Sequence, residues 1–191
     1  NELVARISLK DSAKEIREKE KKFKNAKKLL ESGELKKYEY SDGRYCIVSP
    51  ESIRDVYEEG IVLKHCIHTC DIYFQRMDIR ETYLLFLRRT DKPDVPWYTL
   101  EIEPGGNIRQ KKSVLNEAYK DLDNAMPFLK KWQQWVKKNL SAKDKKLAEK
   151  SDKARKDGYK QLREEKKLIW HGRLQGTLLA DALENDFMEV V

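Results

Sequence analysis

The stretch that decides the fold is TYLLFLRRTDKPDVPWYTLEIEPGGNIRQKK, residues 82–112. Residues 82–89 are β-prone and apolar on both faces, which predicts a strand in the centre of a sheet. In residues 97–103, Trp, Thr and Glu side chains alternate with Tyr, Leu and Ile, as in a second strand. Pro-Gly-Gly-Asn at 104–107 is a strong turn, so residues 108–112 should return beside that strand. The stretch therefore predicts a three-stranded antiparallel meander.

The segment before this meander predicts a hairpin and a helix. Residues 37–41 and 45–48 flank a Ser-Asp-Gly-Arg turn, which favours a hairpin able to join the sheet. Ser49 followed by Pro50 predicts a helix start with Ser49 as the N-cap, and Gly60 should end this helix.

After the meander the apolar period becomes helical. Pro127 is tolerated only in the first turn of a helix or at a break, so we expect a short helix before it and a longer one to about Asn139. Phe128, Trp132 and Trp135 should cover the sheet. The predicted fold class is α+β: a small antiparallel sheet of three to five strands packed by helices, with long charged helical extensions at both ends.

The two ends of the chain predict basic helical arms. Leu9, Ile16, Phe23 and Leu30 recur every seven residues until Ser32-Gly33 stops the pattern, and this stripe should pack on the core or on upstream chain. We expect four regions: a basic amphipathic arm (1–35), an α+β core (36–140), a lysine-rich helix (141–170) and an acidic C-terminal helix or tail (171–191).

Charge follows this division. The 191 residues carry a net charge of +7. Residues 10–37 contribute +5, 38–136 contribute −2, 137–167 contribute +7 and 168–191 contribute −3. Three cysteines exclude a disulfide framework. The absence of a long apolar run excludes a membrane helix and a signal peptide from the sequence, so we expect a cytoplasmic protein with no membrane partner.

The lysine-rich arms have two interpretations. Either their charges only solubilise exposed helices, or they contact phosphates with a salt-dependent affinity that ignores base sequence. The candidate phosphate contacts are Lys137, Lys138, Lys143, Lys145, Lys146, Lys150, Lys153, Arg155 and Lys156. No aromatic platform or zinc-finger signature accompanies them, so base-specific recognition is not predicted.

The segment KHCIHTC, residues 64–70, concentrates histidine and cysteine. A zinc site is disfavoured because on one helix the four ligands would span about 200°, and on one strand one ligand would face away. Only Cys46 or His171 could complete such a site. We therefore predict no metal and no cofactor.

Two further interpretations of this segment stay open. Cys66 is a candidate nucleophile if His65 or a base from elsewhere activates it, or if a helix starting here lowers the pKa of its thiol. Alternatively, Cys66 and Ile67 fill core space while His65 hydrogen-bonds a backbone carbonyl.

These residues resemble the PcfJ-like family, which is encoded by bacterial conjugative elements and phages and is marked by a His-Cys-Val motif. The ordered series of matching residues is Glu59-Gly60, Leu63, His65-Cys66-Ile67, Arg88, Pro93, Pro96, Thr99-Leu100-Glu101, Gln110, Asn116, Trp132 and Trp135, within about residues 45–136. Two positions depart from the family pattern. The family's aromatic residue after the motif is replaced by Cys70, with Tyr73 as a displaced candidate, and Ser113 stands where a glycine is expected.

The resemblance implies a mobile-element context and no particular reaction. Combined with the predicted strands, it selects a set of catalytic candidates. These are His65, Cys66, Arg88, Glu101, Gln110 and Asn116. Arg88, Thr99, Glu101 and Gln110 are polar residues on three consecutive predicted strands, and they form a polar pocket if the register brings them together near His65 and Cys66. The alternative is that Arg88 pairs with Glu101 across two strands on a solvated face.

The leading hypothesis is a PcfJ-like α+β domain of a conjugative plasmid or phage that acts near nucleic acid. Its His65/Cys66 site would serve a reaction that the sequence does not reveal, and whether the protein is an enzyme stays open. The alternative is a non-catalytic interaction module that docks through its helices. The partners that the sequence suggests are nucleic acid through the basic helices and a protein or an upstream domain of the same chain.

Overall fold

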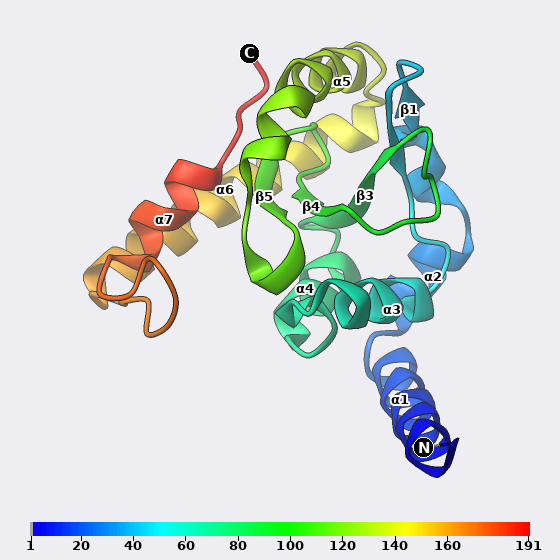
Figure 1. Ribbon diagram of the computed structural model, residues 1–191. Coiled ribbons are helices and arrows are strands. Elements are labelled where there is room, and N and C mark those ends of the chain that lie inside the picture. Colours follow the sequence, from blue (N-terminus) through cyan, green and yellow to red (C-terminus); the bar gives the residue numbers. More distant parts are fainter. Residues whose placement is uncertain (1) are drawn as a thin grey trace.

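A computed structural model of the chain describes the backbone of residues 2–191 and the side chains of residues 11–191. A five-stranded sheet in the order β1-β2-β3-β4-β5 lies at its centre, and every neighbouring pair is antiparallel (Figure 1). The strands are β1 (Tyr40–Ser41), β2 (Tyr45–Val48), β3 (Tyr83–Arg89), β4 (Tyr98–Ile102) and β5 (Ile108–Lys112). The predicted α+β class and the meander are confirmed, with the first hairpin as the other part of the sheet.

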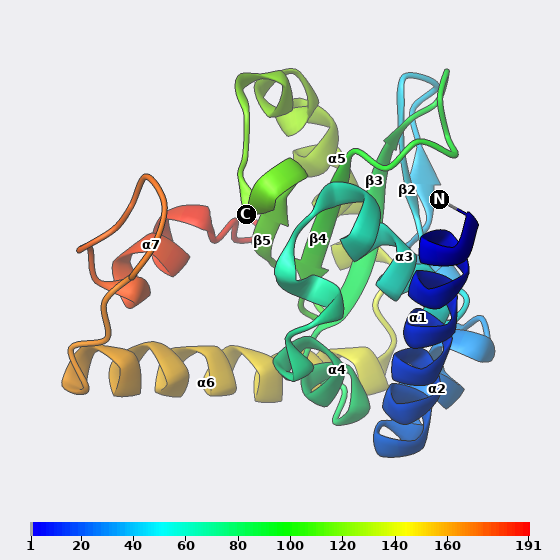
Figure 2. The same cartoon turned by 60° about the horizontal axis from the view of Figure 1, so that its bottom comes forward.

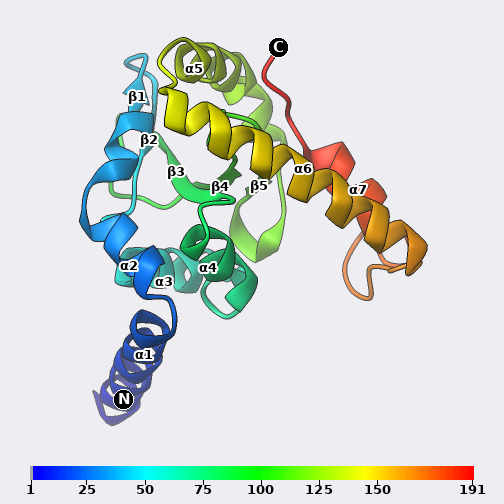
Figure 3. The same cartoon turned by 180° about the vertical axis from the view of Figure 1, so that it is seen from behind.

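Helices cover both faces of this sheet. The α-helices are α1 (Glu2–Lys22), α2 (Lys24–Glu31), α3 (Ile53–Leu63), α4 (Asp71–Asp78), α5 (Met126–Lys138), α6 (Ala142–Glu164) and α7 (Leu179–Asp186). Short 3-10 helices are η1 (Glu34–Tyr38), η2 (Cys66–His68), η3 (Val114–Asn116) and η4 (Lys120–Ala125). Helices α3 and α4 lie on one side of the strands (Figure 2), and α5 and α6 lie on the other (Figure 3). Among the described residues, no helix has both the length and the apolar character that crossing a membrane requires.

The sheet face toward α5 is the apolar one. Leu85 lies opposite Leu100 and Leu87 opposite Tyr98, and all four are fully buried. Trp132 of α5 is also fully buried in this core, where its indole N–H donates to the carbonyl oxygen of Tyr38 at 2.8 Å. The prediction that α5 covers the sheet is therefore confirmed, and Pro127 lies in its first turn as expected. The short helix before it is the 3-10 helix η4.

The opposite face carries polar side chains, yet it is buried as well. Thr99 lies opposite Phe86 and Lys112, and Glu101 lies opposite Gln110. Both Thr99 and Glu101 expose only 2% of their surface because α3 and α4 cover them. The alternation in residues 97–103 therefore does not mark a solvated face. It separates an apolar core from a polar one.

The start of α3 differs from the prediction. The N-cap is Ser52, whose Oγ accepts a hydrogen bond from the Asp55 backbone N–H at 3.1 Å, so the helix begins at Ile53. The Ser49 hydroxyl instead donates to the Glu39 carboxylate at 2.7 Å, which ties this loop to the residue before β1. Prediction of a start at Ser49-Pro50 was wrong because a second serine competes for the same role three residues later.

The end of α3 also differs from the prediction. The helix passes through Gly60 and ends at Leu63, where Lys64 adopts a left-handed φ of 51°. A Cβ atom on Gly60 would lie 2.3 Å from His68 Nδ1. Gly60 is therefore required for the close approach of the His68 ring and does not terminate the helix.

The N-terminal arm is part of the core. Ile16, Phe23 and Leu30 of the predicted stripe are buried, whereas the Leu9 side chain lies outside the described residues. The arm is divided at Phe23, which stacks on Phe74 of α4 with ring centroids 5.7 Å apart. Helix α4 was not predicted, although it supplies the surface on which this arm packs.

The C-terminal region returns to the sheet. Helix α6 ends at Glu164, six residues before the predicted limit of the lysine-rich helix, and Lys166 has a left-handed φ of 51°. After α7, the Met188 N–H donates to the Ile108 carbonyl at 2.8 Å, and the Ile108 N–H donates to the Met188 carbonyl at 2.9 Å. The last residues therefore pair with the outer side of β5. At the opposite edge of the sheet, residues 34–38 form η1, so β1 is shorter than the predicted strand 37–41.

Candidate functional site

The polar face of the sheet, η2, α4 and η3 enclose a small chamber. Its lining consists of His65, Ile67, Tyr73, Thr99, Glu101, Gln110, Lys112 and Asn116. About 10 Å³ of it is open to the centre of a water molecule, roughly the room for one ordered water. Four of the six catalytic candidates, His65, Glu101, Gln110 and Asn116, thus meet at one place. Asn116 is exposed to solvent on its outer side.

An ion pair and a hydroxyl connect helix α3 to His65. Arg88 donates to both carboxylate oxygens of Glu59, at 2.9 and 2.6 Å, and both residues are buried. This two-point geometry is typical of a guanidinium–carboxylate pair. Thr99 Oγ1 lies 3.3 Å from Glu59 Oε1 and 2.9 Å from His65 Nε2. The four side chains therefore form a continuous chain from the sheet to the chamber.

This chain determines which nitrogen of His65 carries the proton. The Glu59 carboxylate can only accept, so the single hydroxyl proton of Thr99 is donated to Glu59. His65 must then donate its Nε2–H to Thr99 Oγ1, which leaves a lone pair on Nδ1. The Nδ1 atom is buried and has no hydrogen-bond partner among the described residues. Burial lowers the pKa of His65 to about 4, so the imidazole is neutral at pH 7.

Glu101 is held by a second set of hydrogen bonds. Its Oε1 accepts from Arg76 at 2.8 Å and from the Thr82 hydroxyl at 2.9 Å, while its Oε2 accepts from the Gln110 amide at 3.0 Å. The Tyr73 hydroxyl donates to the Gln110 carbonyl oxygen at 3.4 Å. Burial raises the pKa of Tyr73 well above its usual value, so its hydroxyl remains a donor. These contacts fix the orientation of three polar groups in the chamber wall.

Cys66 and Arg88 contribute differently from what was expected. Cys66 does not line the chamber, and burial raises the pKa of its thiol to about 11. The thiol is therefore protonated at neutral pH, which argues against a cysteine nucleophile. Arg88 lies opposite Cys46 in the sheet and binds Glu59, so the alternative pairing of Arg88 with Glu101 does not form.

The histidines and cysteines of residues 64–70 do not assemble a metal site. Among the described residues, no group of three or more His, Cys, Asp or Glu side chains is placed to hold an ion. His68 instead packs its ring edge-on against Tyr57, with centroids 5.0 Å apart, beneath Gly60.

The phosphate-contact candidates of the basic region fall into two groups. Exposed lysines with no ion pair among the described residues are Lys137, Lys138, Lys145, Lys146, Lys150 and Lys153. Lys143 lies 3.8 Å from Glu34, and Lys156 lies 2.7 Å from Asp152. Arg155 is buried and ion-paired with Glu103 and Asp152, so it reaches a phosphate only by breaking these contacts.

Three members of the site were not among the sequence-derived candidates: Glu59, Tyr73 and Lys112. The sequence contained an indication for each of these residues. Glu59 belongs to the matching residues of the family resemblance, and Tyr73 was the displaced aromatic candidate. Lys112 is two residues after Gln110 on a predicted strand, so it shares the same face.

Comparison with known proteins gives one match. The model of the family described as PcfJ-like protein matches residues 7–126, well over half of the chain. This region begins within α1 and ends at the first residue of α5, so it includes the N-terminal arm, which the expected span of about 45–136 left out. No curated protein and no solved structure matches the chain. The chain belongs to the PcfJ-like protein family.

Proposed function

We propose that this PcfJ-like domain serves a mobile genetic element, a conjugative plasmid or phage, in the cytoplasm near nucleic acid, and that the chamber around His65 is its reactive site. The observation that carries the proposal is the buried Nδ1 atom of His65, which has no partner among the described residues, on a side chain that lines a chamber of polar groups. A buried acceptor without a partner is costly, and such groups are typical of sites that complete their hydrogen bonds with a ligand.

The chamber offers both a base and hydrogen-bond donors. His65 Nδ1 can accept a proton, while the Asn116 amide can donate to an oxygen-rich group. The Lys112 ammonium lies 3.6 Å from Asp186 Oδ2 and would have to leave this carboxylate to reach such a group. A ligand larger than water needs a movement of the chamber lining, and Asn116 of η3 is a lining residue that is exposed to solvent. Leu115 and Asn116 have left-handed φ values of 58° and 62°, a conformation that asparagine tolerates but that costs Leu115 about 1 kcal/mol or more. This strain favours an opening at η3.

The first test follows the protonation of His65. Long-range ¹H–¹⁵N spectra should show a proton on Nε2 at pH 7 and protonation of the ring only near pH 4. The unfolded imidazole titrates near pH 6.5 and therefore binds a proton before the folded one does. The free energy of unfolding should thus fall by about 2–3 kcal/mol as the pH drops from 6.5 to 4. In His65→Gln this contribution should disappear.

His171→Gln is the matched control, because His171 is exposed in the C-terminal loop. It should keep the pH dependence of the wild type. A screen of phosphate, carboxylates and nucleosides can then be followed through the side-chain amide signals of Gln110 and Asn116. A ligand whose affinity falls at least tenfold in His65→Gln supports the proposal. A proton on His65 Nδ1 would instead favour a non-catalytic interaction module. The same outcome would follow if His65→Gln and His171→Gln bound every ligand with the same affinity.

The nucleic-acid part of the proposal is supported by one face of α6. Lys146, Lys150 and Lys153 lie within about 60° of each other around the helix axis. All three are exposed, and no acidic side chain among the described residues pairs with them. The opposite face of α6 is fixed to the core, since Ser151 accepts hydrogen bonds from Arg109 at 2.9 and 3.2 Å. The lysine row is thus presented on a rigid support.

Changing Lys146, Lys150 and Lys153 together to glutamine tests this row. Each phosphate contact contributes a slope of about −0.9 to the plot of log affinity against log salt for duplex DNA. The triple variant should bind a 20-base-pair duplex about tenfold or more weakly at low salt, with a slope reduced by about 2–3. The matched control, Lys21, Lys24 and Lys28 to glutamine, removes equal charge from α1 and α2. Equal losses in both variants, or no duplex binding by the wild type, would contradict a specific role for α6.

A further inference from the structure

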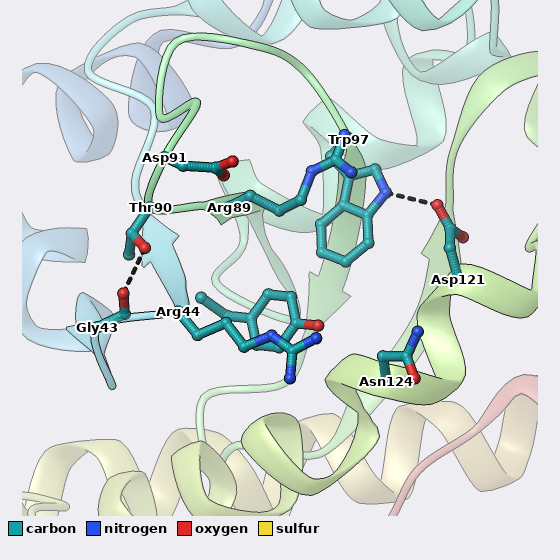
Figure 4. A pocket seen from close by; sticks show the side chains of 9 residues that line it. Gly43, Arg44, Arg89, Thr90, Asp91, Trp97, Asp121 and Asn124 are labelled. Carbon is teal, nitrogen blue, oxygen red and sulfur yellow. Dashed lines mark hydrogen bonds between the residues drawn. The ribbon is translucent and has the colours of Figure 1, made fainter.

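A second cleft lies where β3 ends and the chain returns to enter β4. It is formed by the β1–β2 turn, the end of β3, the residues just before β4 and η4, and its volume is about 450 Å³ (Figure 4). This volume is within the range of small-molecule sites, roughly 300–1,000 Å³. Neither the family match nor the His65 chamber assigns any role to it.

The floor of the cleft is a rigid aromatic pair. Tyr45 and Trp97 stack with centroids 5.6 Å apart and planes at 12°, and they expose only 5% and 7% of their surfaces. The Trp97 indole N–H donates to Asp121 of η4 at 2.8 Å. The Thr90 hydroxyl donates to the Gly43 carbonyl and joins the two loops above this floor (Figure 4). The floor is therefore held in place before any ligand arrives.

Each aromatic ring is covered by one guanidinium group. Arg44 Cζ lies 5.2 Å from the Tyr45 centroid, and Arg89 Cζ lies 5.1 Å from the Trp97 centroid. Both arginines are exposed, and neither forms an ion pair with any described residue. A guanidinium that stacks on a ring keeps its N–H donors at the edge of the plane and leaves its second face free. The cleft thus presents two flat cations, one over each ring of the stacked pair.

We propose that this cleft binds a nucleotide unit of single-stranded nucleic acid. An unpaired base stacks on a guanidinium plane or an aromatic face, and its phosphate accepts hydrogen bonds from the arginine edges. The exposed carboxylate of Asp91 and the amide of Asn124 line the same cleft and would hydrogen-bond the polar edge of a base bound there. A bare phosphate would use the arginines alone, whereas the carboxylates here favour a ligand that carries donors as well as negative charge.

The site is distinct in chemistry from the lysine row of α6. Lysines contact the phosphates of a duplex as point charges, without reading bases. Stacking on Arg44 and Arg89 needs a base that is not already paired and stacked inside a helix. The two surfaces therefore predict different substrate preferences, and they can be tested separately.

The test uses the full chain and the double variant Arg44→Gln, Arg89→Gln. Fluorescence anisotropy with a labelled single-stranded hexanucleotide should show an affinity at least about tenfold lower than that of the wild type, as expected for loss of stacking and charge at one base. Duplex affinity should change by about twofold or less. Because both side chains are exposed, the melting temperature should stay within about 2 °C of wild type.

The matched control is Arg17→Gln, Arg54→Gln, which removes the same charge from exposed positions on α1 and α3. It should lower hexanucleotide affinity by about twofold or less. Competition with nucleoside monophosphates and with inorganic phosphate distinguishes a free nucleotide from a strand as the ligand, and either nucleotide form supports the site. Equal weakening by both double variants overturns the proposal. Competition by phosphate that equals competition by the monophosphates also overturns it, because the cleft would then be an anion site only.

Discussion

Replacing Glu59 with alanine should lower the free energy of unfolding by about 3–5 kcal/mol, because it leaves the Arg88 guanidinium buried without its counter-charge. Both side chains of the pair are at least 94% buried, and Arg88 donates to both carboxylate oxygens. Chemical denaturation followed by tryptophan fluorescence measures the change. The loss is a large fraction of the stability of a typical domain, about 5–15 kcal/mol.

The adjacent residue provides the control. Glu58→Ala removes an exposed carboxylate whose contact with Arg54 is 3.6 Å long, and it should cost about 0.5 kcal/mol or less. Combining Glu59→Leu with Arg88→Met should recover stability relative to Glu59→Ala, since no charge is then left buried. Similar losses for Glu58→Ala and Glu59→Ala would show that the ion pair is not what the fold depends on.

Trp132→Ala should have an effect of similar size, about 3–5 kcal/mol, because it removes the largest fully buried side chain and leaves a cavity against the sheet. It also leaves the Tyr38 carbonyl oxygen without the indole N–H that donates to it. Trp132→Phe retains most of the apolar volume and isolates this hydrogen bond, with an expected cost of about 1–3 kcal/mol. Urea unfolding of the three proteins gives both numbers.

Trp170→Ala is the matching exposed substitution. The Trp170 side chain is 70% exposed in the loop after α6, so its loss should change stability by about 0.5 kcal/mol or less. A cost for Trp132→Ala as small as this would mean that α5 does not close the apolar side of the sheet.

The strands were predictable because their signals are local. The run at 82–89 is short, β-prone and apolar on both faces, as in a central strand, and the alternation at 97–103 has the period of two of a strand. What the alternation cannot report is that both faces are covered. Glu101 exposes 2% of its surface and Leu100 exposes none. Glu101 is buried because α4, from another part of the chain, packs over it and places Arg76 against its carboxylate.

The convergence of the polar candidates was predictable only in part. Glu101 and Gln110 are neighbours in register, so strand pairing alone places them together. Arg88 could not be assigned in the same way, because its partner Glu59 comes from a helix whose rotation over the sheet is a tertiary property. The aromatic–arginine cleft was missed for a related reason. Tyr45 and Arg89 meet through the pairing of β2 with β3, and Trp97 reaches them from the following loop.

The pairing of Met188 with Ile108 has a consequence for how the protein behaves at high concentration. An outermost strand with free N–H and C=O groups invites a neighbouring molecule to add its own strand. In this protein one border of the sheet is sealed by its own C-terminal residues, with Asp186 Oδ2 also accepting from the Lys111 N–H at 3.2 Å. The opposite border is a strand of two residues, Tyr40–Ser41. The fold thus resists edge-to-edge aggregation at both edges of the sheet. At β5, the C-terminal residues occupy hydrogen-bonding groups that a strand from another molecule would otherwise use.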